Sequence, residues 1–242
     1  MKNNTYDDSS TYETNCINYL NLCKRLKKEE EKSAPIIHEL LAKPRNEQTH
    51  CLKYSINSTL YRGSLFPSLI YDVVVGNTKR GRISSRKPKG KDYYIYYFDN
   101  NQLAFVEQII DSQLASIEVI IPGKSGVVYG FNYTLGELSY VNECRYYDGK
   151  LVEHFHMFYD TSLDIEYYRL LSEQYTYEND KLHKVQMKEF DSAIINYSKL
   201  DYIFKYNEDG KATSYSAIDY NEKYAHPITL GSYAIPKPKQ FN

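Results

Sequence analysis

The fold of this chain is constrained most strongly by a series of two-residue turn signals, each lying between segments in which apolar and polar residues alternate. The turns are Asn100-Asn101, Leu135-Gly136, Asp148-Gly149, Asn179-Asp180 and Asp209-Gly210. Strands joined by such short connections are antiparallel neighbours, because parallel pairing needs a crossover of about a dozen residues or more. The sequence therefore predicts a long antiparallel β-meander over about residues 51–224.

The strands expected in this region are 52–61, 68–76, 92–98, 102–111, 114–121, 125–134, 136–147, 150–160, 163–178, 181–191, 197–207 and 211–220. The last residues, 225–242, carry three prolines, which cannot donate to a strand ladder. They are predicted to form an extended tail on the surface.

The first 50 residues show helical periodicity instead. Ser10 followed by Glu13 forms a capping box. A set of apolar residues recurs at helical spacing after it: Cys16, Tyr19, Leu20, Cys23 and Leu26. A first helix is predicted over about 11–31, and a second begins near Pro35 and ends before Pro44. The chain is therefore predicted to be a single α+β domain, with a helical segment over about 11–43 followed by the antiparallel sheet.

The composition excludes several classes of protein. The 242 residues carry a net charge of -1, which argues against a surface tuned as a whole for nucleic acid or acidic lipid. The first residues lack the basic and apolar segments of a signal peptide, and the longest apolar runs are too short to span a bilayer. A cytoplasmic location is expected. The 27 tyrosines, with no tryptophan, favour a sheet that has a broad amphipathic surface.

The four cysteines, Cys16, Cys23, Cys51 and Cys144, show no CxxC pair and no zinc-finger spacing. They are expected to be reduced thiols without a bound metal, and Cys16 and Cys23 are expected to share one helix face. No cofactor is expected, because the sequence has no phosphate-binding glycine loop, no dinucleotide fingerprint and no zinc-protease or serine-hydrolase motif.

A cationic stretch, residues 77–91, interrupts the strands. It contains no acidic residue and carries seven cations: Lys79, Arg80, Arg82, Arg86, Lys87, Lys89 and Lys91. Its glycines, serines and proline predict a flexible loop between two strands. Such a loop can bind phosphates or an acidic protein surface. The alternative is a solubilising loop that binds nothing specific.

The hairpin around Asp148-Gly149 contains two histidines, and its register decides which residues lie beside them. With a two-residue turn at this position, Glu143 lies opposite His154 on the more exposed face. Tyr140 then lies opposite Met157 on the buried face.

Glu143, His154 and His156 therefore form a candidate acid–base or metal cluster. A metal would need a further ligand, and a flat sheet face supplies no substrate pocket. A hairpin without a site is the simpler interpretation, and no catalytic residue is assigned.

Several turns share a cadence in which an aromatic residue is followed by Asp, Asn or Glu, often Gly, and then Lys or Gln. It occurs as FDNNQL at 98–103, YDGKL at 147–151, YENDKL at 177–182 and YNEDGK at 206–211. This cadence resembles the YD-repeat hairpins of bacterial RHS-type proteins, over about residues 93–220. The resemblance implies tyrosine-aspartate turns that join the strands of a wrapping sheet.

The chain is also similar in general character to immunity proteins of bacterial polymorphic toxin systems, which are cytoplasmic single-domain proteins that bind a cognate toxin domain. We therefore expect a non-catalytic protein-binding module, and the resemblance implies neutralisation of a toxin domain. The alternative is an RNA-binding or single-stranded nucleic-acid-binding protein, or a nuclease. In that case the cationic stretch would hold phosphates, tyrosines would stack on bases, and His154 or His156 would act in catalysis.

Overall fold

The structure is a computed structural model that describes residues 9–46, 50–56, 83–160, 167–210, 212–220 and 228–234. These residues form one helix, α1 (Ser9–Ala42), and twelve strands. The strands are β1 (Cys51–Ser55), β2 (Tyr93–Asp99), β3 (Gln102–Ile110), β4 (Gln113–Pro122), β5 (Val127–Thr134), β6 (Glu137–Tyr147), β7 (Lys150–Asp160), β8 (Tyr167–Glu178), β9 (Lys181–Asp191), β10 (Asn196–Tyr206), β11 (Ala212–Asp219) and β12 (Ile228–Ala234).

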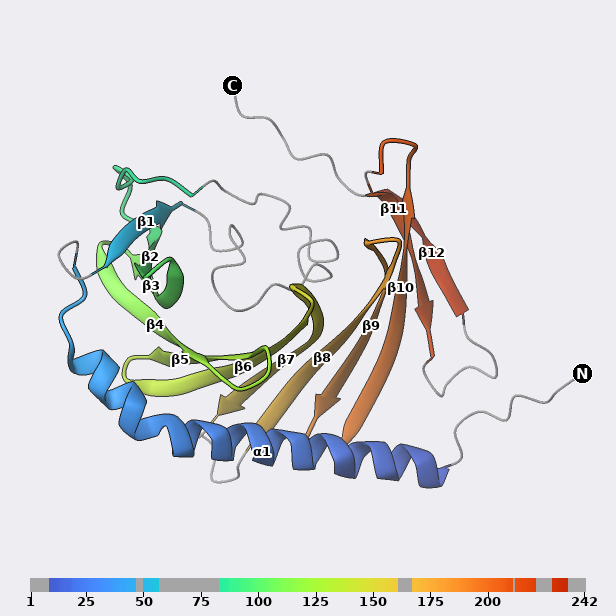
Figure 1. Cartoon of the computed structure of the whole chain (residues 1–242). Helices are drawn as coiled ribbons and strands as arrows, with labels where there is room; N and C mark the ends of the chain where they lie inside the picture. Colours follow the sequence, from blue (N-terminus) through green and yellow to red (C-terminus); the bar gives the residue numbers. More distant parts are fainter. Residues whose placement is uncertain are drawn as a thin grey trace, which may run out of the picture.

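All twelve strands belong to one sheet, and their order in the sheet is their order in the sequence. Every pair of neighbouring strands is antiparallel (Figure 1). The predicted α+β class with a long antiparallel meander is therefore confirmed. Among the described residues, no helix combines the length and apolar character that a membrane-spanning helix requires.

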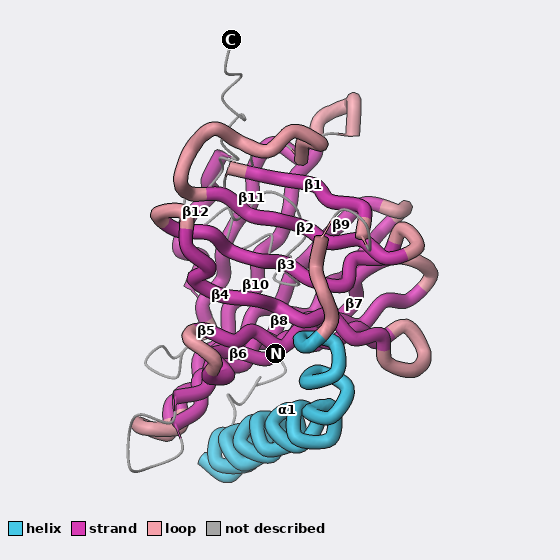
Figure 2. The backbone as a smooth tube through the Cα atoms, turned by 90° about the vertical axis from the view of Figure 1, so that its left-hand side faces the viewer, coloured by secondary structure: helices cyan, strands magenta, loops and turns pink. Residues whose placement is uncertain are grey.

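The sheet is strongly curved, and α1 lies across its outer side (Figures 1 and 2). One row of paired apolar residues crosses the outer face from strand to strand: Tyr97, Phe105, Val119, Phe131, Val141, Met157, Leu170 and Phe190. The helix adds Cys16, Cys23, Leu26 and Ile37 to the same cluster. The main core of the described residues therefore lies between α1 and the sheet.

The inner face of the sheet is apolar as well, with two smaller clusters. One contains Tyr96, Val106, Ile120 and Cys144, and the other contains Tyr175, Val185, Tyr202, Phe204, Tyr215 and Ala217. The tyrosines thus serve mainly as packing residues on both faces, where an aromatic ring buries a large apolar area.

The helix differs from the prediction because it is continuous where two helices were expected, and it contains Pro35 in its interior. A proline removes one backbone hydrogen bond and favours a bend, and the last turns of α1 lie at an angle to the rest (Figures 1 and 2). Ile37, Leu40 and Leu41 beyond the proline pack on the same core as the first turns. This burial holds the helix together across Pro35. Cys16 and Cys23 share the buried face, as predicted.

Three further segments differ from the expectation or lie outside it. The predicted strand 68–76 lies outside the described residues. Residues 228–234, expected within an extended tail, form β12 and pair with β11. Part of the cationic stretch is held against β1, because Ser84 forms an antiparallel bridge with Tyr54.

The hairpins share a β-bulge that was not predicted from the sequence. In five of them an aromatic or isoleucine side chain pairs with a leucine across the turn, and the register shifts by one residue directly after that pair. The pairs are Phe98–Leu103, Ile109–Leu114, Tyr133–Leu138, Tyr146–Leu151 and Tyr177–Leu182. Bulges of this kind bend a strand and increase its twist, which accounts for the curvature of the sheet.

Candidate functional site

The bulge changes the surroundings of the two histidines. Tyr147 pairs with Lys150 as predicted, but beyond the bulge Glu143 lies opposite Phe155, and His154 lies opposite Cys144. The predicted Glu143–His154 pair is therefore wrong, because one extra residue in β7 moves every later side chain to the other face.

The Tyr140–Met157 pair is wrong for the same reason, since Tyr140 lies opposite Phe158 and Met157 lies opposite Val141. Met157 is nevertheless fully buried, on the outer face under α1. Both faces of this hairpin are thus covered, whereas the prediction left one of them exposed.

The histidines belong to a polar cluster on the inner face that is centred on Asn142. The Asn142 amide nitrogen donates to Glu118 Oε1 at 2.9 Å. Its Oδ1 lies 3.2 Å from His154 Nε2 and 2.8 Å from His156 Nδ1. Asn142 and His154 are fully buried, and Glu118 is nearly so. One amide therefore connects residues from β4, β6 and β7.

The cluster continues from His154 into β8. His154 Nδ1 lies 3.3 Å from Glu173 Oε2, and the Tyr175 hydroxyl donates to the same oxygen at 2.6 Å. Because the Asn142 amide nitrogen donates to Glu118, Asn142 Oδ1 faces both histidine rings as an acceptor.

His156 is uncharged near neutral pH. Burial, followed by the influence of His154, lowers the pKa of His156 to about 3. Its neutral ring packs 4.9 Å from the ring of Tyr140, centroid to centroid.

This cluster links strands across the inner face of the sheet and borders a small pocket. In the part of the chain that the structure describes, no three His, Cys, Asp or Glu residues lie close enough together to hold a metal ion. A pocket beside Glu118, lined also by Tyr94, Gln108 and Tyr140, has a volume of about 80 Å³. Pockets that hold drug-sized ligands are several times larger. The cluster therefore joins β4, β6, β7 and β8 through buried polar contacts.

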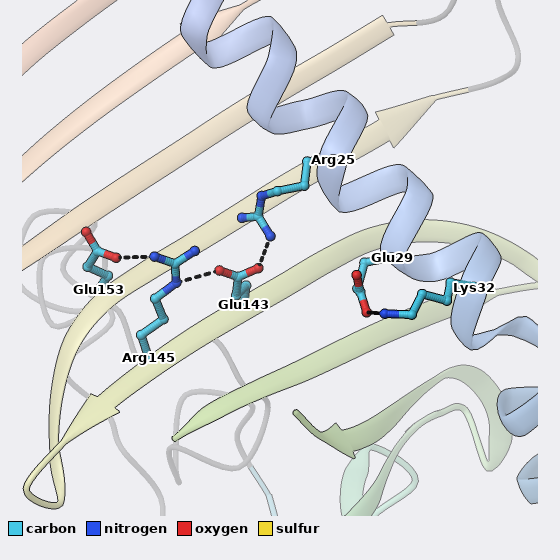
Figure 3. A network of polar contacts seen from close by, with 6 residues as sticks. All are labelled: Arg25, Glu29, Lys32, Glu143, Arg145 and Glu153. Atoms are coloured by element: carbon cyan, nitrogen blue, oxygen red, sulfur yellow. Dashed lines mark hydrogen bonds and ion pairs between the residues drawn. The ribbon is translucent and has the colours of Figure 1, made fainter. Parts of the chain in front are cut away.

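Glu143, the third member of the predicted cluster, lies on the opposite face of the sheet, where it is fully buried. It accepts from Arg25 of α1 at 2.6 Å and from Arg145 at 2.7 Å. Arg145 also donates to Glu153 at 2.9 Å (Figure 3). Glu143 thus fixes the helix to the sheet, and the structure does not bring it together with His154 and His156.

The cationic stretch is only partly described, since Lys79, Arg80 and Arg82 lie outside the described residues. The remaining four cations, Arg86, Lys87, Lys89 and Lys91, are all exposed. We call residues 86–91 the cationic segment. It follows the edge of β1, next to the beginning of β2 and the turn between β3 and β4.

Backbone contacts hold the cationic segment in this place. Ser84 and Tyr54 exchange two backbone hydrogen bonds of 2.8 and 2.9 Å. At the other end, the amide of Ser112 donates to the carbonyl of Lys91 at 3.0 Å. Between these points, Lys87 Nζ lies 5.3 Å from the centre of the Tyr93 ring. The four cations are thus presented from an anchored backbone, where the sequence predicted a loop without fixed contacts.

The histidines and the cationic segment do not form one site. The segment lies along β1, and the histidines lie on β7, with five strands between these two in the sheet. His154 is also fully buried. The histidines and the cationic segment therefore lie on separate parts of the described sheet.

The tyrosines of the described part differ widely in their exposure. Nine tyrosines are buried: Tyr54, Tyr93, Tyr96, Tyr97, Tyr159, Tyr168, Tyr175, Tyr202 and Tyr215. The exposed tyrosines of the described part are Tyr147 and Tyr233. The sequence could not separate buried from exposed tyrosines, because both faces of the sheet are covered and alternation no longer marks a wet face.

Comparisons with known proteins identify no relative. No protein-family model matches the chain, and a search of curated proteins finds no significant match.

Proposed function

We propose that this protein acts by binding another protein, and that the cationic segment is part of the contact surface. The observation that supports this proposal is the anchoring of the segment between Ser84 and Lys91, which presents four cations to solvent. A charged surface whose backbone is already ordered loses less entropy on binding than a free loop does. Complementary charge also accelerates encounter with an acidic partner.

The more specific form of the proposal is that of a cytoplasmic bacterial immunity protein that neutralises a toxin domain. It is supported by the resemblance of the chain to such proteins in general character and by the cadence of its hairpins. Direct inhibition by contact requires no catalytic residue, cofactor or metal in the inhibitor.

Nucleic-acid binding is the less favoured function. Four exposed cations also suit phosphates, but proteins that hold single strands combine such cations with exposed aromatic rings on which bases stack. Among the tyrosines whose exposure is described, only Tyr147 and Tyr233 are exposed, and the others are half-buried or buried.

The test is charge reversal at the cationic segment with a matched control. The test variant carries Arg86→Glu, Lys87→Glu, Lys89→Glu and Lys91→Glu. The control carries the same change at four exposed lysines elsewhere: Lys24, Lys28, Lys124 and Lys205. Both variants alter the net charge equally, so a difference between them reports on location.

Each variant is used to recover partners from a nuclease-treated extract of the source organism and is coexpressed with toxin domains encoded beside its gene. We expect the wild-type chain and the control to bind a protein and to protect cells, and the test variant to associate more slowly. Equal behaviour of both variants would contradict the proposed role of the segment. Retention on single-stranded nucleic acid, with no protein bound, would favour the alternative function.

A further inference from the structure

Most of the exposed large aliphatic residues of the sheet lie at one of its two rims, and Leu230 within β12 is an exception. In a meander, successive turns alternate between the two ends of the strands. The turns β3–β4, β5–β6 and β9–β10 therefore lie on the same rim. The end of β1, which Ile56 follows, lies there as well, next to the beginning of β2. This rim carries Ile56, Ile110, Leu114, Leu135, Ile194 and Ile195, all exposed. We call these six residues the aliphatic rim.

The opposite rim has a different character. Its described turns are Asn100-Asn101, residues 123–126, Asp148-Gly149, Asn179-Asp180 and residues 207–210. Next to these described turns, the one exposed large apolar side chain is that of Tyr147. Isolated exposed apolar residues are ordinary, but their accumulation on a single rim is not explained by the meander itself.

Two residues of the aliphatic rim also have unfavourable backbone conformations. Leu135 has a φ of 54° and is 92% exposed, and Ile195 has a φ of 46° and is 64% exposed. Positive φ is costly for a leucine and more so for a β-branched residue, whereas asparagine tolerates it. The opposite rim places Asn100 at the equivalent first turn position. Neither conformation nor solvation therefore favours aliphatic residues at these turns, and unfavourable conformations of this kind cluster at functional sites.

The aliphatic rim is continuous with the cationic segment, because the amide of Ser112 in the β3–β4 turn donates to the carbonyl of Lys91. Neighbouring strands are about 5 Å apart, so the β3–β4 and β9–β10 turns lie roughly 30 Å apart along the sheet. A protein–protein contact of ordinary size, about 800 Å² on each partner, has a similar width.

We infer that the aliphatic rim is the docking surface of the partner, and that this partner is a protein with an apolar patch bordered by acidic side chains. The inference rests on the proposed function and specifies its contact surface. The aliphatic side chains would enter the apolar patch, and the cationic segment would face the acidic border. Burial of such side chains slows dissociation, while the cations accelerate association.

A protein fits this rim better than nucleic acid or an anionic membrane does. Aliphatic side chains offer no ring for base stacking. Exposed acidic residues also lie at the turns of this rim, such as Asp111 beside Ile110 and Glu137 close to Leu135. Phosphates and anionic lipids repel these carboxylates, whereas a protein surface can match charges of both signs.

The experiment compares three variants in binding kinetics with the purified protein partner that the wild-type chain recovers. The rim variant carries Leu135→Asn, Ile194→Ser and Ile195→Asn, which suit the turn conformations and remove the apolar surface. Tyr147→Asn on the opposite rim is the control, and the four-fold charge reversal of the cationic segment is the third variant. We expect the rim variant to bind roughly tenfold more weakly or worse, through faster dissociation. The control should bind like the wild type.

The outcomes distinguish this inference from the proposed function. Normal binding by the rim variant, together with slow association of the charge-reversed variant, would overturn the role of the rim and leave the proposed function standing. If the wild-type chain binds no protein, both fail. The inference would also be overturned if the rim variant loses binding to phosphatidylserine vesicles, or loses self-association in sedimentation, while its affinity for the protein partner is unchanged.

Discussion

At the scale of single residues, Asn142 decides how the inner polar cluster is organised. Its amide nitrogen donates to Glu118 and its oxygen faces both histidines. The polar atoms of a buried cluster need such partners, since an unsatisfied buried group costs about 1–3 kcal/mol.

His156 gives this cluster a predictable dependence on pH. Burial and the neighbouring His154 lower the pKa of His156 to about 3 in the folded protein, while an unfolded histidine titrates near 6.5. Between these values the unfolded state binds a proton that the folded state does not. Stability should therefore fall as the pH decreases from about 6.5 toward 3, by up to about 1.4 kcal/mol per pH unit from this residue.

The measurement is urea unfolding of the wild type and of His156→Gln at a series of pH values from neutral to acidic. The variant should be less stable at neutral pH but should lose stability less steeply on acidification. Parallel pH profiles for the two proteins would show that His156 is protonated in the folded state, contrary to this expectation.

At the scale of elements, the repeated unit is a hairpin with a fixed order of parts. An aromatic residue or isoleucine comes first, then one residue, a two-residue turn, one more residue, a leucine and a bulge, as in Tyr146–Leu151 and Tyr177–Leu182. The first and last apolar residues form a cross-strand pair next to the turn. The cadence seen in the sequence therefore reports a packing contact, and the bulge behind it curves the sheet.

The sequence revealed the meander and its turns because these depend on local chemistry. The residues of four predicted turns have positive φ throughout, such as Asp148 and Gly149. The bulge was not predictable, since Leu151 and Val152 are both apolar and neither marks the extra residue. An error of one position was enough to place Glu143 beside His154, when its real partner is Arg25, more than a hundred residues earlier in the chain.

Turn chemistry also predicts a stabilising substitution. Leu135→Asn should raise the free energy of unfolding by about 0.5–1 kcal/mol, because asparagine adopts positive φ more easily than leucine does. The reciprocal change, Asn100→Leu, should lower it by a similar amount, since Asn100 has a φ of 47°. Chemical denaturation of both variants checks the pair. Destabilisation by Leu135→Asn would mean that Leu135 contributes to folding, and its binding role would lose this support.

At the scale of the whole molecule, α1 connects strands that are far apart in the sheet. It contacts β4, β6, β8 and β10, so one helix spans seven consecutive strands. Ionic contacts repeat the same pattern, with Arg25 bound to Glu143 on β6 and Arg45, just beyond the helix, bound to Glu107 on β3. A meander without this helix would have mostly contacts between sequential neighbours, which can open strand by strand.

Leu26 tests whether α1 makes the sheet cooperative. Its side chain is fully buried in the cluster between the helix and the outer face. Leu26→Ala should lower the free energy of unfolding by about 2–5 kcal/mol. If the contacts of α1 make the sheet unfold as one unit, the slowest-exchanging amides of β4, β6, β8 and β10 should all lose protection by the same factor in hydrogen exchange.

The control is Ile17→Ala on the exposed side of the same helix, which should change the free energy of unfolding little. Loss of protection confined to α1 and one adjacent strand would show that the helix folds as a separate unit and that the sheet does not depend on it.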